Sequence, residues 1–333
     1  MPESVLIYSM GEVIGDGMIK LPFVAAVREA FPGARIVWCA AGGETVYAGP
    51  LKPVTAGLID EILTAGPTGA KPLDGLFGGK PFGGRCFDLV IDTQENPRRS
   101  RFVKRAGGDF ISATKDFCYS TRRPSADDKT RWPPAVVDRL AKLLSLAKGG
   151  PATLKPIKLA DDRARAAAEA LLPDGRHYVG FAPGAGGQDK RWPLASYLAL
   201  AERARGAGLT PVFFFGPDEA EDARTTRAAL PDALMPEFER TDAFQDVKGP
   251  LLVVAMAARL KAAVANDAGP GHMLAAGGAP LLSLQKDHRR AIKFRPAAER
   301  LKLLVAEDFG PTMAALPIET VWEGLTGLLE EGG

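Results

Sequence analysis

The sequence of 333 residues predicts two doubly wound α/β domains that follow each other along the chain. Its length is enough for two domains of ordinary size. In each half, short apolar runs alternate with helical patterns, which favours parallel strands joined by helices. The turn-rich segment 148–151 separates the halves, and we place the domain boundary between residues 155 and 156.

The first half begins with a buried strand and a helix. The apolar run 5–8 predicts the strand, and the helical pattern of residues 18–27 ends before Pro32 and Gly33. Further strands are expected at 35–39, 59–63 and 87–91, a surface loop at 66–84 and a helix at 136–148.

The second half repeats this alternation. Strands are expected at 177–182, 211–215, 262–266 and 280–284. Helices are expected at 194–207, 220–230, 251–260, 269–276 and 315–329. The last helix is expected to pack back on the first domain.

Composition excludes several classes of protein. Hydrophobic residues make up 46% and charged residues 25%, which excludes a disordered or fibrous chain. The net charge of +2 argues against general nucleic-acid binding. Cys39, Cys86 and Cys118 lie too far apart for a zinc motif, so we expect neither a metal nor a cofactor. Without a signal-peptide pattern or a long apolar run, a cytoplasmic protein with no transmembrane segment is expected.

The segment 182–193 has the composition of an anion-binding turn. It follows a predicted strand and precedes a helix, so Gly184 and Ala185 lie where free backbone amides attract a phosphate. Lys190 adds a full positive charge. No Walker A sequence is present, and Asp189 stands where a dinucleotide fingerprint needs its third glycine. The alternative is a plain tight turn with a solvated lysine.

A second anion-facing turn is predicted at 265–276. Asp267, Ala268 and Gly269 lead from a strand into a helix that carries His272. Two such turns in one domain suit a nucleoside diphosphate. For Asp267 the alternative is a helix cap, and for His272 it is a structural role in the helix.

Two further carboxylates are candidates. Asp16 lies between glycines where a loop enters a helix, which suits a general base, although it could instead cap that helix. Glu219 follows the end of a strand, where a carboxylate can bind ribose hydroxyls. An exposed acid at a helix start explains Glu219 equally well.

Basic residues gather in the first half. Arg98 and Arg99 belong to one run and Arg122 to another, and both runs suit an anionic acceptor or lipid headgroups. The alternative is a solvated charged face.

Four motifs together resemble those of glycosyltransferase family nine, the ADP-heptose:lipopolysaccharide heptosyltransferases. They are Gly15-Asp16 with Leu21-Pro22 and 31–36; Asp88-Leu89-Val90-Ile91-Asp92-Thr93-Gln94; Pro183-Gly184 with Lys190-Arg191-Trp192-Pro193; and Asn266-Asp267-Ala268-Gly269-Pro270-Gly271-His272. The resemblance implies a GT-B fold, in which two Rossmann-like domains face each other across a cleft. It implies an acceptor-binding domain over residues 1–155 and a donor-binding domain over 156–333.

The resemblance also assigns roles. It implies that Asp16 is the catalytic base, that Lys190 and the 267–272 loop contact the donor diphosphate, and that Glu219 contacts the ribose. Family members often carry hydroxyl side chains where this chain has Ala185 and Ala268. The segment 285–290 replaces the usual Phe-Gly-Pro turn, and its basic residues could compensate.

The expected function is therefore inverting, metal-independent sugar transfer. A heptose-like sugar would move from a nucleoside-diphosphate donor, with ADP-heptose favoured, to a lipopolysaccharide core or related glycan at the inner face of the inner membrane. Two alternatives stay open: a degenerate GT-B protein that binds a nucleotide or a partner without turnover, and a nucleotide-sugar epimerase or hydrolase.

Overall fold

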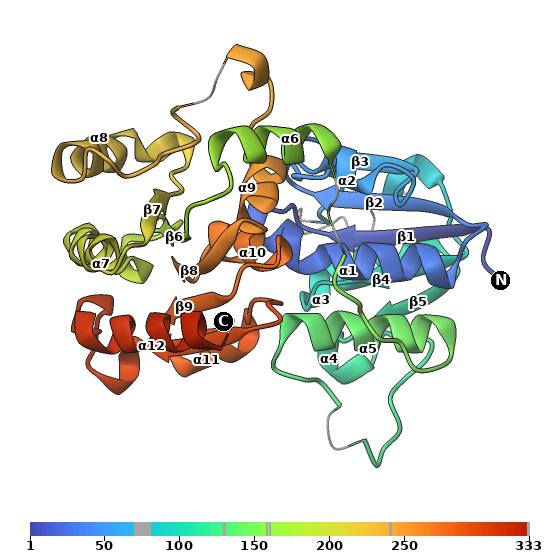
Figure 1. The fold of residues 1–333 in the computed structure, drawn as a ribbon. Coiled ribbons are helices and arrows are strands. Elements are labelled where there is room, and N and C mark those ends of the chain that lie inside the picture. The colour runs from blue at the N-terminus through green and yellow to red at the C-terminus, as the bar shows by residue number, and fades with distance from the viewer. Residues whose placement is uncertain (70–80, 129–130, 158, 160, 240–241, 332–333) are drawn as a thin grey trace. The chain divides into compact units, whose positions relative to one another are not determined.

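The chain forms two compact units, Met1–Ile157 and Lys158–Gly333. The computed structural model describes residues 1–69, 81–128, 131–157, 159, 161–239 and 242–331 (Figure 1). Residues 70–80, the middle of the loop predicted at 66–84, lie outside the described residues. Each unit holds one parallel sheet covered by helices, so the predicted doubly wound α/β class is confirmed.

The sheet of unit 1 has five parallel strands in the order β3-β2-β1-β4-β5. Its central strand β1 is a continuous apolar run, as expected for a strand covered on both faces. Ser4 of β1 is paired with Arg35 of β2, and Val5 with Leu89 of β4. The strands are β1 (Ser4–Ser9), β2 (Arg35–Ala41), β3 (Glu61–Gly66), β4 (Leu89–Asp92) and β5 (Asp109–Ser112).

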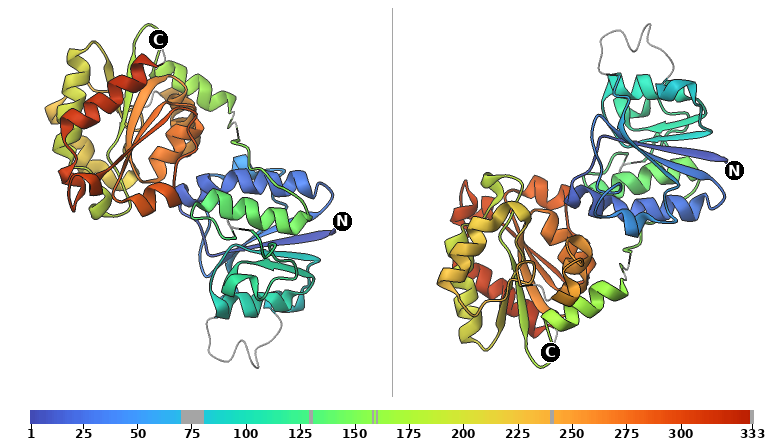
Figure 2. Two further views of the ribbon diagram at one scale, coloured as in Figure 1. Left: turned by 90° about the horizontal axis from the view of Figure 1, so that it is seen from below. Right: turned by 90° about the horizontal axis from the view of Figure 1, so that it is seen from above.

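Two long helices of unit 1 pack against each other on the same face of its sheet (Figure 2). These are α1 (Ile14–Ala30) and α5 (Val136–Lys148). Helix α5 ends at Gly149, whose φ of 74° is a left-handed conformation that favours glycine. The shorter helices are α2 (Lys52–Thr55), α3 (Pro97–Val103) and α4 (Thr114–Phe117).

The sheet of unit 2 also has five parallel strands, in the order β10-β9-β8-β6-β7. Its core includes an aromatic pair, Phe181 of β6 and Phe213 of β7, whose ring centroids lie 5.2 Å apart. The strands are β6 (Tyr178–Ala182), β7 (Thr210–Phe213), β8 (Leu260–Asn266), β9 (Leu281–Gln285) and β10 (Leu301–Val305).

Helices cover both faces of the second sheet (Figure 2). One face carries α7 (Leu194–Gly206) and α12 (Ile318–Glu330), and α8 (Ala220–Ala229) packs beside α7. The other carries α6 (Asp162–Leu171), α9 (Pro250–Ala257) and α10 (Gly269–Ala276). The short α11 (His288–Lys293) contacts β9 and β10.

The last helix is built into unit 2. Val321, Leu325 and Leu328 of α12 are buried in the core cluster that contains Phe181 and Phe213. The buried face of this helix is therefore used within unit 2.

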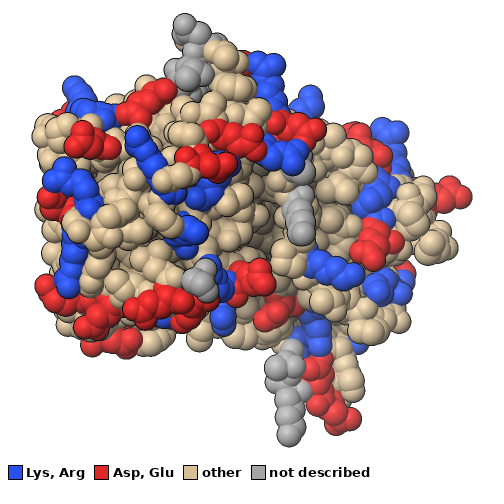
Figure 3. Space-filling model, in the orientation of Figure 1, with Lys and Arg blue, Asp and Glu red and all other residues tan. Residues whose placement is uncertain are grey.

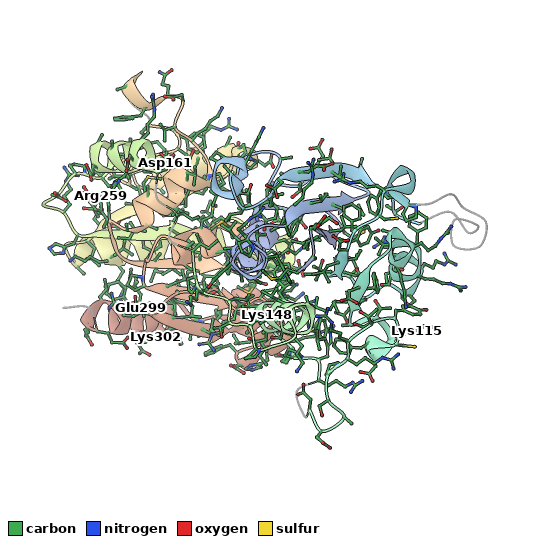
Figure 4. The ribbon with its side chains drawn as sticks, turned by 90° about the vertical axis from the view of Figure 1, so that its right-hand side faces the viewer. Lys115, Lys148, Asp161, Arg259, Glu299 and Lys302 are labelled. Atoms are coloured by element: carbon green, nitrogen blue, oxygen red, sulfur yellow. The ribbon has the colours of Figure 1, made fainter. Side chains whose placement is uncertain are left out.

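The two ends of α6 illustrate how polar side chains complete a helix that is rich in alanine. The carboxylate of Asp161 accepts a hydrogen bond from the backbone N–H of Ala164 in the first turn. At the other end, Arg259 donates to the carbonyl of Leu172. Figure 4 labels Asp161 and Arg259.

The sequence interpretation did not include the strands β5 and β10 or the helices α2, α3, α4, α6 and α11. Strand β5 contains only two apolar residues, and α6 is rich in alanine, so neither has a strong periodic pattern. Lys, Arg, Asp and Glu side chains are interspersed over the face drawn in Figure 3, as the near-neutral charge leads one to expect. Among the described residues, no helix has the length and hydropathy needed to cross a bilayer.

The packing of α12 makes a direct prediction. Leu325→Ala should lower the free energy of unfolding by about 2–5 kcal/mol, because it leaves a cavity in the core of unit 2. Urea unfolding measures this loss. The exposed Glu323→Ala on the same helix is the control and should change stability by less than about 0.5 kcal/mol. Equal effects of both changes would contradict the assignment of this helix to the core.

Candidate functional site

The strand order of unit 2 reverses between β6 and β8, which are neighbours in the sheet although β7 separates them in the sequence. In open α/β sheets, ligands bind at the carboxyl ends of the strands at such a switch point. The two turns predicted to face an anion leave the sheet at these ends. The structure therefore brings together Gly184, Ala185 and Lys190 with Asp267, Ala268, Gly269 and His272 at one edge of unit 2.

Asn266 joins the two turns directly. Its side-chain amide donates to the carbonyl of Pro183 at 2.7 Å, and its side-chain oxygen accepts from the backbone N–H of Trp192 at 3.2 Å. Both bonds are buried, so they hold the start and end of the first turn against the end of β8. The sequence motif contained Asn266, but only the structure shows this role.

The Glu219 side chain packs against the first turn, which follows β6. Its carboxylate is 10% exposed, accepts from the backbone N–H of Gly216 at 2.8 Å and pairs with Arg191 at 3.2 Å. A Cβ atom at Gly184 would lie only 1.9 Å from the Glu219 Oε1. Glycine at position 184 is thus what lets this carboxylate approach the turn.

A cavity of about 410 Å³ opens beside Lys190. Lys190 belongs to a short 3-10 helix, Gln188–Lys190, and Asp189 next to it pairs with Lys286. Five cationic side chains line this cavity, and they are Lys190, Lys286, Arg289, Arg290 and Lys293. The sequence pointed to the basic residues after β9, and the structure brings them to the same cavity as Lys190.

Asp267 is not the cap of α10. The N-cap residue is Ala268, and no side chain caps this helix end. The Asp267 carboxylate, 4% exposed, instead accepts from the Nε of Arg290 at 2.6 Å. The alternative role as a helix cap is therefore wrong, because the helix begins two residues later and Asp267 points to α11.

His272 lies inside α10 and is buried. Burial lowers the pKa of the imidazole from 6.5 to about 4. Near pH 7 the side chain is therefore neutral, with one ring nitrogen that donates and one that accepts a hydrogen bond.

Asp16 is the third residue of α1, so it does not cap this helix. The N-cap residue is Val13, and the alternative reading of Asp16 as a cap is wrong. Among the described residues, the Asp16 carboxylate makes no hydrogen bond and no ion pair. It is partly exposed, which leaves both oxygens available to a ligand.

Sequence analysis missed Glu12, which fixes the turn before α1. Its buried carboxylate accepts from Ser9, from Lys20 at 3.0 Å and from the Trp38 indole at 3.2 Å. The pattern Met10-Gly11-Glu12 did not indicate this role, because the partners of Glu12 lie in other elements: Lys20 in α1 and Trp38 in β2. The hydrogen bonds of Glu12 thus fix the turn that leads to Asp16, whereas the Asp16 carboxylate has no partner among the described residues.

Arg98 and Arg99 lie in the first turn of α3, which follows β4 at the switch point of unit 1. Their backbone N–H groups donate to the side chain of Asn96, and Arg98 is exposed. Arg122 has a different setting. It pairs with Asp109 and donates to two carbonyls at the end of α5, so its guanidinium already serves the fold.

Asp92 is a second carboxylate that sequence analysis did not single out as a site. It ends β4, where burial raises its pKa from 3.8 to about 6 despite hydrogen bonds from Ser100 and Ser112. Its position in the motif 88–94 was visible, but its burial was not.

A model of one family, described as glycosyltransferase family 9 (heptosyltransferase), matches residues 79–314. The chain belongs to this family. It is therefore a heptosyltransferase-family glycosyltransferase, an enzyme that takes a nucleotide-sugar donor and a glycan acceptor. A search of curated proteins found no match.

Solved structures of family 9 proteins share the fold of this glycosyltransferase. A glycosyl transferase family 9 protein from Veillonella parvula is 18% identical, with a TM-score of 0.69 and coverage of 99% of this chain and 98% of the other. E. coli ADP-heptose lps heptosyltransferase II is 19% identical, with a TM-score of 0.65 and coverage of 98% and 99%. E. coli heptosyltransferase WaaC with ADP is 18% identical, with a TM-score of 0.64 and coverage of 99% of both chains. The GT-B class expected for the family 9 chain is confirmed.

The approach of Glu219 to Gly184 in this family 9 protein can be tested by substitution. Gly184→Ala should lower the free energy of unfolding by about 1–3 kcal/mol, because Glu219 must leave its bonds to Gly216 and Arg191 to make room. Thermal or urea unfolding measures the loss. Gly186→Ala in the same turn is the control, since a Cβ there meets nothing within 4 Å. A loss of the same size in both variants would argue against the close approach.

The buried His272 predicts a pH dependence of stability. Its pKa is lower in the folded than in the unfolded chain, so the unfolded state binds more protons between pH 6.5 and about 4. The contribution is complete above pH 6.5 and should fall by roughly 3 kcal/mol as the pH drops to about 4. His272→Asn should remove this part of the pH dependence in denaturant unfolding, whereas the exposed His177→Gln should leave it unchanged. Equal slopes in wild type and His272→Asn would refute the assignment.

Proposed function

We propose that this glycosyltransferase transfers a heptose-like sugar with inversion and without a metal ion. ADP-heptose is the favoured donor, and a lipopolysaccharide core or related surface glycan is the acceptor. The observation that carries the proposal is the cationic cavity beside Lys190, which the turn after β6 and the basic segment after β9 form in unit 2.

Unit 2 is proposed to bind the donor. The turn at Gly184, Ala185 and Lys190 and the turn at Asp267, Ala268 and Gly269 would hold the diphosphate, with His272 as a neutral neighbour. Glu219 would approach the ribose. The positive charge of Lys190 would stabilise the charge that grows on the leaving diphosphate, the task that a divalent cation performs elsewhere.

Unit 1 is proposed to supply the base and the acceptor site. Asp16 would take the proton of an acceptor hydroxyl while that oxygen forms a bond to the anomeric carbon. The bond from this carbon to the diphosphate oxygen breaks, and the electron pair leaves with the nucleoside diphosphate. Attack from the face opposite the leaving group inverts the configuration. Asp16 suits this step because its carboxylate forms no hydrogen bond or ion pair with any described residue.

The acceptor assignment rests on charge. Arg98 and Arg99 lie at the carboxyl edge of the sheet of unit 1, on the same edge as the turn that leads to Asp16. They would bind anionic groups of a lipid-linked glycan at the cytoplasmic face of the inner membrane. Arg122 is the weakest member of the predicted acceptor set, because its guanidinium is already paired.

Two solved relatives support the choice of donor. The E. coli structures are described as an ADP-heptose lps heptosyltransferase II and as a heptosyltransferase WaaC with ADP. At 19% and 18% identity they support the fold, and their donors are carried to this chain only as a proposal.

The base assignment can be tested with Asp16→Asn. This change should lower kcat for transfer by about 10²–10⁴-fold, the usual contribution of a general base, and leave ADP binding within twofold of wild type. Transfer from ADP-heptose to a deacylated lipopolysaccharide core would be followed by mass spectrometry. Glu29→Gln, an exposed acid at the other end of α1, is the control and should leave kcat unchanged. Normal turnover by Asp16→Asn would exclude Asp16 as the base.

Nucleotide binding and product analysis distinguish a transferase from an epimerase or a hydrolase. Calorimetric titration with ADP, UDP, GDP and TDP tests the nucleotide, and ADP should bind most tightly. Release of free sugar or an epimerised donor, with no glycan product in the presence of acceptor, would contradict the transferase proposal.

A further inference from the structure

The segment that follows β9 is connected to both anion-facing turns of unit 2. Lys286 pairs with Asp189 of the first turn at 2.6 Å, and Arg290 pairs with Asp267 of the second at 2.6 Å. The residues of each pair are 97 and 23 positions apart in the sequence. Two cations from one short segment are thus fastened to the two turns at which a diphosphate would bind.

The charge around the cavity is unbalanced. Its lining contains five cations but only two carboxylates, those of Asp189 and Asp287. Three of the cations, Lys190, Arg289 and Lys293, form no ion pair with any residue that the structure describes. Positive charges gathered in a concave site attract an anion, and a phosphate group with several oxygens can neutralise more than one of them.

The two turns themselves offer little beyond backbone. Ala185 and Ala268 carry no side-chain donor. Among the residues that the structure describes, Lys190 is the only charged side chain of the two turns that forms no ion pair. Lys286 and Arg290 bring further donors to the two turns, because each is bonded to a residue of a turn.

We propose that Lys286 and Arg290 bind the diphosphate of the donor directly and that, with Lys190, they set the affinity of the site for it. The proposal rests on the proposed function, in which the ligand of unit 2 is a nucleoside diphosphate. It assigns to the basic segment 286–290 the side-chain contacts that Ala185 and Ala268 cannot make.

Arg290 is held ready for this contact. Its Nε donates to the nearly buried Asp267, and no described residue accepts from its two terminal nitrogens. A guanidinium fixed through Nε keeps four N–H bonds for the oxygens of a phosphate. The ring of Phe294 lies 5.0 Å from this guanidinium and restricts its movement further.

Lys286 reaches the ligand by exchanging partners. Its present partner Asp189 is 64% exposed, and exposed ion pairs of this kind contribute little to stability. A diphosphate carries more charge than one carboxylate, so it competes successfully for the ammonium group. Removal of the Asp189 carboxylate should then favour the ligand.

The experiment uses the full chain and calorimetry with inorganic pyrophosphate and with ADP. Lys286→Gln and Arg290→Lys should each weaken binding of both ligands by about tenfold, the effect of one lost charge-assisted hydrogen bond. Arg290→Lys keeps a positive charge beside Asp267, which protects the fold. Arg224→Gln is the control, because Arg224 is an exposed cation of α8 whose partner is Glu221. It should bind both ligands as wild type does.

Asp189→Asn provides a test that does not depend on loss of function. It should bind pyrophosphate about two- to fivefold more tightly, because Lys286 is released to the ligand. If the ion pair of Asp189 and Lys286 had a purely structural role, Asp189→Asn and Lys286→Gln would both leave the affinity for pyrophosphate unchanged or lower it.

Two results would overturn the inference: wild-type affinity for pyrophosphate in Lys286→Gln and Arg290→Lys, or unchanged or weaker binding in Asp189→Asn. Neither depends on the transferase reaction. A chain that transfers no sugar, yet loses pyrophosphate affinity in these variants, would refute the proposed function and support this inference. Normal sugar transfer together with unaltered pyrophosphate binding in the variants would support the proposed function and refute this inference.

Discussion

At the carboxyl edge of its sheet, the architecture of unit 2 depends on the hydrogen bonds of the Asn266 side-chain amide. This amide bonds to Pro183 and to Trp192, the two ends of the turn after β6, from the last residue of β8. The bonds are possible only because β6 and β8 are neighbours in the sheet. An amide serves where a carboxylate would not, since one bond requires a donor and the other an acceptor.

Buried carboxylates in both units are satisfied by partners from other secondary-structure elements. Glu12 is held by Lys20 and Trp38, and Asp267 by Arg290. A buried charge without such partners would be costly, so these networks fix the turns that precede or follow the strands. Asp16 differs because its carboxylate has no partner among the described residues. Fixed turns with one free functional group are the arrangement that a positioned base requires.

Positive charge is distributed in a similar way. The chain as a whole is close to neutral at +2, yet the cavity of unit 2 gathers five cations from two separate segments. Such local concentration is more informative about a ligand than net charge, because a concave surface adds the fields of its charges. In this member of glycosyltransferase family 9, the cavity is the site that we propose for the nucleotide-sugar donor.

The sequence by itself determined the alternation of strands and helices and the position of the two turns predicted to face an anion, because apolar periodicity, glycines and the neighbouring lysine are local features. It did not reveal β5, α6 or α11, whose patterns are short or rich in alanine. Nor could it decide between the roles open to Asp267 and Asp16, since capping depends on where each helix begins. Only the tertiary structure placed β6 beside β8, Arg290 beside Asp267 and Lys286 beside Asp189. These contacts join residues far apart in the chain, and strand order and side-chain packing, not local propensity, determine which of them meet.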